Sequence, residues 1–183
     1  MFPTSFSRDG ETLVYTELHP DTGLDVWALS IDSGEARPLL RTEFAEAAAV
    51  LSPDGNYMAF SSNESGREEV YVRAYPGNEG RWQISTDAGS EPMWSRDGKE
   101  LFYRAGTSLM VVDVVTEPRF EPAKPRVAFE APYDQAGSLY ANYDVRPDGR
   151  NFVMIRSEQD AAASRIHVVL HWFDELGRRV PIP

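Results

Sequence analysis

The side chains best suited to chemistry are a few carboxylates and aromatic residues that stand just before, or at the start of, short apolar runs. The candidates for ligand contact are Glu46, Glu91, Tyr140, Asn142 and Tyr143. Acidic groups beside aromatic rings suit a cationic or peptide-like ligand with backbone N–H groups to offer. Two carboxylates about 5 to 10 Å apart across a gap can also hydrolyse a glycosidic bond. For that chemistry the candidates are Glu46, Glu91 and Asp144.

Metal and cofactor chemistry have little support in the sequence. There is no cysteine, which excludes thiolate zinc sites, iron–sulfur clusters, disulfides and cysteine nucleophiles. His19 stands before a proline, and His167 and His171 would lie about 13 Å apart along one strand, too far to share an ion. The acid-rich stretches 21–25 and 63–69 do not match the twelve-residue calcium loop and are typical of hairpin turns. We therefore expect no metal and no cofactor.

Motifs that mark common enzymes are also missing from the sequence. It has no G-x-S-x-G nucleophile elbow, no phosphate-cradling G-x-x-x-x-G-K-[ST] and no kinase signature set. We expect no catalytic residues and no enzymatic activity in this chain.

The net charge of the chain limits which partners are expected. The 183 residues contain 18 Lys and Arg against 29 Asp and Glu, a net charge of −11, so neither nucleic acid nor an anionic membrane surface is an expected partner. No apolar run approaches the roughly 18 to 20 residues needed to span a bilayer, and we expect no membrane insertion. Residues 1–5 lack the basic and apolar regions of a signal peptide. The sequence assigns no compartment, and an extracytoplasmic place stays open for a chain that belongs to a larger protein.

A four-residue tag recurs along the chain and organises it. The tags end in Asp9-Gly10, Asp54-Gly55, Asp97-Gly98 and Asp148-Gly149, with steps of 45, 43 and 51 residues between the aspartates. Asp caps local backbone N–H groups and Gly adopts positive φ, so these eight residues are predicted to be structural turns.

Short runs rich in β-branched and aromatic residues flank each tag and predict four strands per repeat. Inner strands are expected near 3–7, 47–51, 91–95 and 141–145, and outer strands near 36–41, 80–85 and 125–130. A repeat of about 45 residues with four antiparallel strands is typical of a propeller blade. We predict an all-β β-propeller over residues 1–183, with blades at about 1–42, 46–86, 90–131 and 140–183. In the last blade, residues 179–182 are one candidate for the outer strand, and residues 173–177 could instead begin a short helical turn.

Four blades are the lower limit for a closed propeller. The chain either closes as a four-bladed ring or forms a half-ring that a second copy completes. An open arc exposes two apolar sheet faces, which favours self-association as a dimer.

Several repeats resemble the TolB-like, WD-type propeller repeat, notably residues 51–60, 91–103 and 143–152. The ending, residues 168–181, resembles the C-terminus of bacterial proteins that join a Ser/Thr protein kinase domain, or another N-terminal module, to a C-terminal propeller. The resemblance implies a propeller fold and a sensor or protein-contact role, without kinase activity in this chain.

We therefore expect a non-catalytic binding or scaffold module for a protein or peptide partner. Two alternatives stay open: a hydrolase that uses the acidic channel carboxylates, and a purely structural fragment whose blades pair with other blades.

Overall fold

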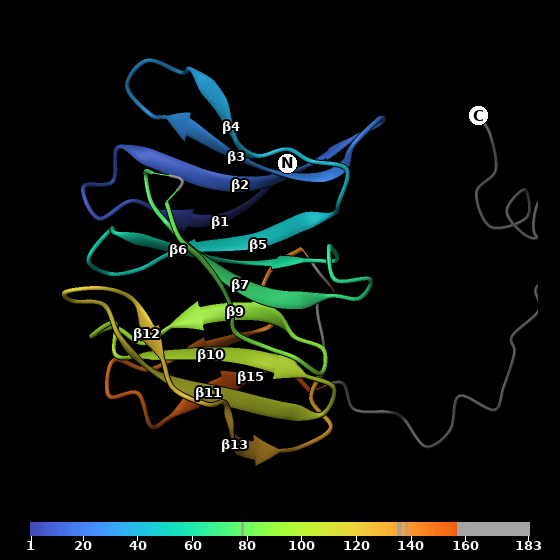
Figure 1. The fold of residues 1–183 in the computed structure, drawn as a ribbon, viewed down its shortest axis with the longest axis vertical. Coiled ribbons are helices and arrows are strands. Elements are labelled where there is room, and N and C mark those ends of the chain that lie inside the picture. Colours follow the sequence, from blue (N-terminus) through green and yellow to red (C-terminus); the bar gives the residue numbers. More distant parts are fainter. Residues whose placement is uncertain (78, 135–136, 138, 157–183) are drawn as a thin grey trace, which may run out of the picture.

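The computed structural model describes residues 1–77, 79–134, 137 and 139–156. Within these ranges every regular element is a strand, and no helix is present that could cross a membrane. The strands form successive antiparallel sheets that stack on one another like slices along an arc (Figure 1).

Blade 1 and blade 2 each contain four strands in sequence order, from the inner to the outer edge. Blade 1 consists of β1 (Phe2–Phe6), β2 (Thr12–His19), β3 (Gly23–Ser30) and β4 (Ala36–Leu40). Blade 2 consists of β5 (Glu46–Leu51), β6 (Tyr57–Ser62), β7 (Glu69–Ala74) and β8 (Arg81–Gln83). The predicted outer strand 80–85 is shorter in the structure, where β8 ends at Gln83. Beyond it, the backbone N–H groups of Ile84 and Ser85 both donate to the carbonyl oxygen of Val70, which breaks the ladder pattern.

Blade 3 follows the same plan with one addition. It consists of β9 (Ser90–Trp94), β10 (Glu100–Ala105), β11 (Ser108–Val115) and β13 (Arg126–Glu130). The short β12 (Glu121–Pro122) pairs with the end of β11, beyond the part that β13 covers. The sequence did not predict β12, because two residues carry no periodic pattern.

The fourth repeat is described in part. It contributes β14 (Tyr143–Val145) and β15 (Phe152–Met154), which pair with each other. The candidate outer strand 179–182, and the strand expected to carry His167 and His171, lie outside the described residues.

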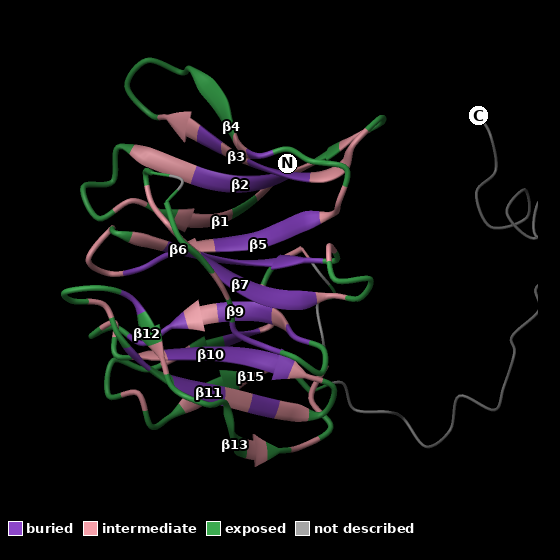
Figure 2. Cartoon of the chain, viewed as in Figure 1, coloured by how far each residue is buried: buried purple, intermediate pink, exposed green. Residues whose placement is uncertain are grey.

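The core lies in the seams between blades (Figure 2). In each blade the side chains alternate, so one set faces the preceding blade and the other faces the next. Val14, Val26 and Leu40 of blade 1 thus pack against Phe60 and Tyr71 of blade 2. The other face of blade 2 packs against blade 3 around Phe120, and blade 3 packs against β14 and β15.

Candidate functional site

The candidate site lies at the edge of the arc where the inner strands begin. Because the blades repeat one strand order, β5, β9 and β14 start at the same edge, and the β2–β3 and β6–β7 hairpins reach it. We call this the entry edge and define it as residues 19–25, 41–46, 62–69, 84–91 and 140–143. It contains all five residues predicted to bind a ligand.

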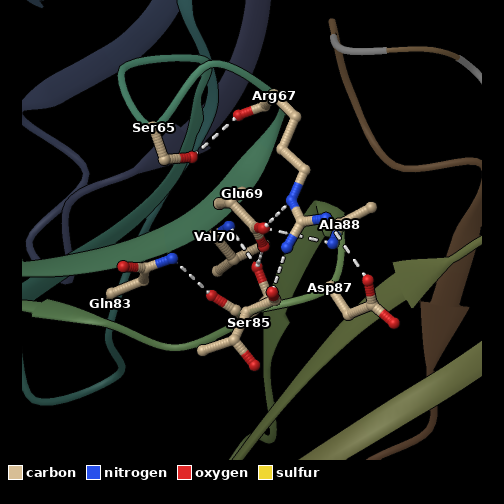
Figure 3. A network of polar contacts seen from close by, with 9 residues as sticks. Ser65, Arg67, Glu69, Val70, Gln83, Ser85, Asp87 and Ala88 are labelled. Carbon is tan, nitrogen blue, oxygen red and sulfur yellow. Dashed lines mark hydrogen bonds and ion pairs between the residues drawn. The ribbon is translucent and has the colours of Figure 1, made fainter.

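In blade 2 the entry edge is held by one buried carboxylate, Glu69, which is 1% exposed. Its carboxylate accepts hydrogen bonds from Arg67 Nε at 2.7 Å, from the backbone N–H of Ala88 at 3.1 Å and from the Ser85 hydroxyl (Figure 3). Ser85 Oγ in turn accepts from the backbone N–H of Val70 at 2.7 Å. We call Arg67, Glu69, Ser85 and Ala88 the blade 2 corner. Both carboxylate oxygens have partners there, and the corner ties β7 to the linker that enters blade 3.

Blade 1 has a carboxylate at the equivalent place, but its hydrogen bonding is incomplete. Asp25 is fully buried, and its Oδ2 accepts from Thr22 Oγ1 at 2.6 Å and lies 3.7 Å from Arg41 Nε. Its Oδ1 has no hydrogen-bond partner. We call Thr22, Asp25, Arg41 and Glu46 the blade 1 corner.

Glu46, the second acid of the blade 1 corner, is 2% exposed at the start of β5. Its Oε1 accepts from the Thr42 hydroxyl, whereas its Oε2 has no partner. Burial raises the pKa of Glu46, and the charge of Asp25 acts in the same direction. This carboxyl group is therefore easier to protonate than an ordinary glutamate.

Glu91 is also buried and connects blade 3 to the fourth repeat. It is 0% exposed and sits at a bulge of β9 with φ of 54°. Its Oε2 accepts from the backbone N–H of Asn142 at 2.9 Å, and its carbonyl oxygen accepts from the Tyr143 hydroxyl at 2.8 Å. Burial raises the pKa of Tyr143 well above its ordinary value, and the charge of Glu91 adds to the rise. These three predicted residues thus come together, in contact with each other.

The predicted site residues therefore divide by exposure. Glu46, Glu91 and Tyr143 are buried, Asn142 is half-buried, and Tyr140 is 45% exposed. Asp144 is exposed, and its Oδ1 accepts from the backbone N–H of Val145 at 2.7 Å. Burial does not support the direct ligand contact predicted for Glu91, which stays a prediction.

Three buried charged residues at or beside the entry edge were not among the predicted site residues. They are Asp25, Glu69 and Arg104. A signal for the first two was present, since an acid followed by valine and an aromatic residue opens the second run of two repeats, Asp25-Val26-Trp27 and Glu69-Val70-Tyr71. Arg104 had no such signal. It is 1% exposed on β10, and only its Nη2 has hydrogen-bond partners.

The four Asp-Gly tags form turns of one geometry on the opposite edge. Gly10, Gly55, Gly98 and Gly149 all have φ between 66° and 79°, a region that favours glycine. In three tags a serine hydroxyl donates to the aspartate, as Ser95 does to Asp97 at 2.8 Å. Hydrogen bonds from that serine and from the next turn residues lower the pKa of Asp9 and Asp97.

A cavity of about 470 Å³ lies between blade 3 and the fourth repeat. Its apolar lining includes Phe102, Phe129, Phe152 and Met154, and its polar rim includes Glu100, Arg126 and Tyr133. The Phe129 and Phe152 rings meet edge to face with centroids 5.4 Å apart. We call this half-open groove, whose lining includes both aromatic and charged side chains, the aromatic groove.

Comparison with known proteins supports the fold. None of the protein-family models matches the chain. Among solved structures, a TolB-type protein from Agrobacterium tumefaciens superimposes with a TM-score of 0.57 at 17% identity, over 85% of this chain and 58% of that one. TolB from Acinetobacter baumannii gives 0.57 at 16% identity, over 86% and 43%. The chain has a TolB-like propeller fold. It spans about half the length of these propeller proteins.

A third similar structure is an enzyme. An oligogalacturonate lyase in complex with manganese superimposes on this TolB-like chain with a TM-score of 0.60 at 14% identity, over 86% of this chain and 47% of the lyase. Within the described part of this chain, no three His, Cys, Asp or Glu side chains gather in a way that could hold a metal ion. At such low identity the likeness concerns the fold alone.

Proposed function

We propose that this TolB-like propeller is a non-catalytic module that binds a protein or peptide partner. The observation that carries the proposal is the aromatic groove between blade 3 and the fourth repeat. Phe129, Phe152 and Met154 offer apolar and aromatic contacts, while Glu100 and Arg126 at the rim offer charge. Binding sites in proteins combine an apolar lining with a few polar groups in this way.

A peptide library tests the proposal. The full chain is panned against random peptides, and the affinity of enriched peptides is measured by fluorescence polarisation. We expect Phe129→Ala to weaken binding at least tenfold, and Leu18→Ala, a 68% exposed residue of blade 1, to leave it unchanged. Enrichment of no peptide, or equal loss in both variants, would contradict the proposal.

The hydrolase alternative has one supporting feature, the raised pKa of Glu46. A general acid must come within hydrogen-bond distance of its substrate, and Glu46 is 2% exposed. Binding therefore has the better support. Turnover of a glycan or peptide panel that disappears in Glu46→Gln would favour the enzyme instead.

We also propose self-association through blade 1. Because Val14 and Val26 face blade 2, alternation turns Leu13 and Trp27, both half-buried, to the other face of blade 1. Phe6, opposite Leu13 and 59% exposed, extends that face. Light scattering is expected to give twice the chain mass of 20.5 kDa at micromolar concentration, and Phe6→Glu to return the mass to one copy. A single-copy mass for the wild type would exclude the dimer.

The kinase-linked setting rests on the sequence resemblance of residues 168–181, which lie outside the described residues. It implies that the propeller acts as the partner-contact part of a longer protein.

A further inference from the structure

Blade 1 has a cavity of about 430 Å³ that the proposed peptide binding does not use. It lies beside β3, β4 and the exposed turn that joins them (Figure 2). Because Ala28 shares the face of Val14 and Val26, the cavity borders the side of blade 1 that faces blade 2. Its lining is polar apart from two alanines and consists of Thr12, Ala28, Ser30, Ser33, Glu35, Ala36 and Arg37. We call it the blade 1 cavity.

Blade 2 shows that the fold does not require a hollow at this position. Pairing registers align three lining residues with larger ones of blade 2: Thr12 with Tyr57, Ala28 with Val72, and Arg37 with Trp82. The rings of Tyr57 and Trp82 pack on Phe120, with centroids 5.0 and 4.9 Å from it. Blade 1 therefore has small or polar side chains where blade 2 has an aromatic cluster.

In blade 3 the equivalent arginine has two carboxylate partners. Arg126 occupies the place of Arg37 in the strand register. Its Nη2 lies 3.3 Å from Glu100 Oε1 and 3.1 Å from Asp113 Oδ1. In blade 1, hydroxyl residues replace both acids: Thr12 stands in the place of Glu100, and Ser30 in that of Asp113. Blade 1 thus keeps the arginine without the two carboxylates that flank it in blade 3.

The blade 1 cavity offers hydrogen-bond donors to a ligand. Within the described part of the chain, no carboxylate lies within 4 Å of the Arg37 guanidinium, although the exposed Glu35 lines the same cavity. Ser30 Oγ accepts from the backbone N–H of Ser33 at 3.4 Å, and Ser33 Oγ accepts from that of Glu35 at 3.3 Å. Their O–H groups can then donate to a ligand. A guanidinium beside hydroxyl donors is suited to a carboxylate or a phosphate.

We propose that the blade 1 cavity binds a small polyhydroxylated anion, a sugar phosphate or a sugar acid. The oxyanion takes the place that two carboxylates have beside Arg126, pairs with Arg37 and accepts a hydrogen bond from Ser30. A hydroxyl group of the ligand donates to Glu35. A volume of about 430 Å³ falls within the roughly 300 to 1,000 Å³ of small-molecule sites, which leaves room for a sugar ring beside the anionic group. This site shares no lining residue with the aromatic groove.

Isothermal titration calorimetry of the full chain tests the ligand class. The four probes are glucose 6-phosphate, glucuronate, inorganic phosphate and glucose. We expect glucose 6-phosphate or glucuronate to bind about tenfold more tightly than glucose, which lacks the oxyanion, and than inorganic phosphate, which lacks the hydroxyl groups. The tighter of the two tells whether the oxyanion is a phosphate or a carboxylate. Binding of neither, or equally tight binding of glucose or of inorganic phosphate, would overturn the proposal.

Substitutions then locate the site. Arg37→Met is expected to weaken binding of the tighter probe at least tenfold, and the control Arg8→Met, which removes an exposed arginine elsewhere in blade 1, to leave it unchanged. Thr12→Glu restores the carboxylate that blade 3 has at this place, so it should pair with Arg37 and weaken binding more than the uncharged Thr12→Gln does. Unchanged affinity in Arg37→Met, or equal losses in Thr12→Glu and Thr12→Gln, would overturn the assignment.

Discussion

Blades 1 and 2 each have an acidic residue at the same position of the same hairpin. The two corners differ in how many hydrogen bonds the carboxylate accepts. Glu69 reaches Arg67, Ser85 and the backbone N–H of Ala88. Asp25 is one methylene shorter, and one of its oxygens has no partner. The cation differs as well: Arg67 stands two residues before Glu69, where blade 1 has Gly23, so Asp25 relies on Arg41 at 3.7 Å.

The repeats thus share the geometry of their turns but differ in the hydrogen bonds and ion pairs at their entry-edge corners. A buried carboxylate with full hydrogen bonding rigidifies its surroundings, whereas a partly satisfied one costs free energy. We therefore expect the blade 2 corner to stabilise the contact between blades more than the blade 1 corner does.

Removal of Glu69 is the strongest test of this contrast. Glu69→Ala breaks three hydrogen bonds to one buried carboxylate and leaves the Ala88 N–H without its acceptor, so we expect a loss of about 3 kcal/mol in the free energy of unfolding. Urea denaturation followed by circular dichroism measures it. Asp87→Ala is the matched control, because Asp87 pairs with Arg67 at 3.3 Å but its side chain is 99% exposed. A control as destabilised as Glu69→Ala would show that surface charge, not the buried corner, is responsible.

A smaller effect is expected from the equivalent change in blade 1. Asp25→Asn keeps the size of the side chain and loses an ion pair at 3.7 Å and a charge-assisted bond from Thr22. We expect a loss of about 1 kcal/mol in the same urea assay, since the wild type already carries an unpartnered oxygen. Equal losses for Asp25→Asn and Glu69→Gln would remove the distinction between the corners.

The strands of this propeller could be predicted from the sequence because their signals are local. The predicted inner strand 47–51 is β5, Glu46–Leu51, and the predicted outer strand 125–130 is β13, Arg126–Glu130. Each is a short run with a consecutive apolar stretch, and the first is followed directly by a turn tag, so a window of a few residues suffices.

The burial and hydrogen bonding of the entry-edge residues could not be predicted, because both depend on the neighbouring blade. Glu91 stands in a polar stretch that looks solvated in sequence, yet the Asn142 N–H, 51 residues away, meets its carboxylate. The acidic ligand site indicated by the sequence stays a prediction; the structure shows that one of its acids, Glu91, also connects blade 3 to the fourth repeat.

The tag turns lie on the opposite edge from both corners, and the three that contain a serine should respond alike to loss of their aspartate. Asp54→Ala loses hydrogen bonds from Ser52 Oγ and from the backbone N–H of Asn56, at 3.1 Å for the latter, and we expect a loss of about 1 kcal/mol at pH 7. Burial acts to raise the pKa of Asp54, but these bonds outweigh it and lower the pKa below its ordinary 3.8. The advantage of the wild type is therefore present above pH 3.8 and is lost as the pH falls through the lowered pKa. Urea curves of both proteins between pH 3 and 7 should converge at the acid end.

The smallest expected effect is an increase in the free energy of unfolding, and it comes from a substitution in the blade 1 corner. Burial raises the pKa of Glu46 above its ordinary 4.5, so the folded protein holds this proton more tightly than the unfolded chain. Stability is then lost as the pH rises from 4.5 through the raised pKa, the reverse of the tag aspartates. Glu46→Gln removes that ionisation, so the variant should match the wild type near pH 4.5 and exceed it by less than about 1 kcal/mol at pH 8. Glu43→Gln, an exposed neighbour, should show no such divergence, and a destabilised Glu46→Gln at pH 8 would mean that the ionised carboxylate is a useful part of the corner.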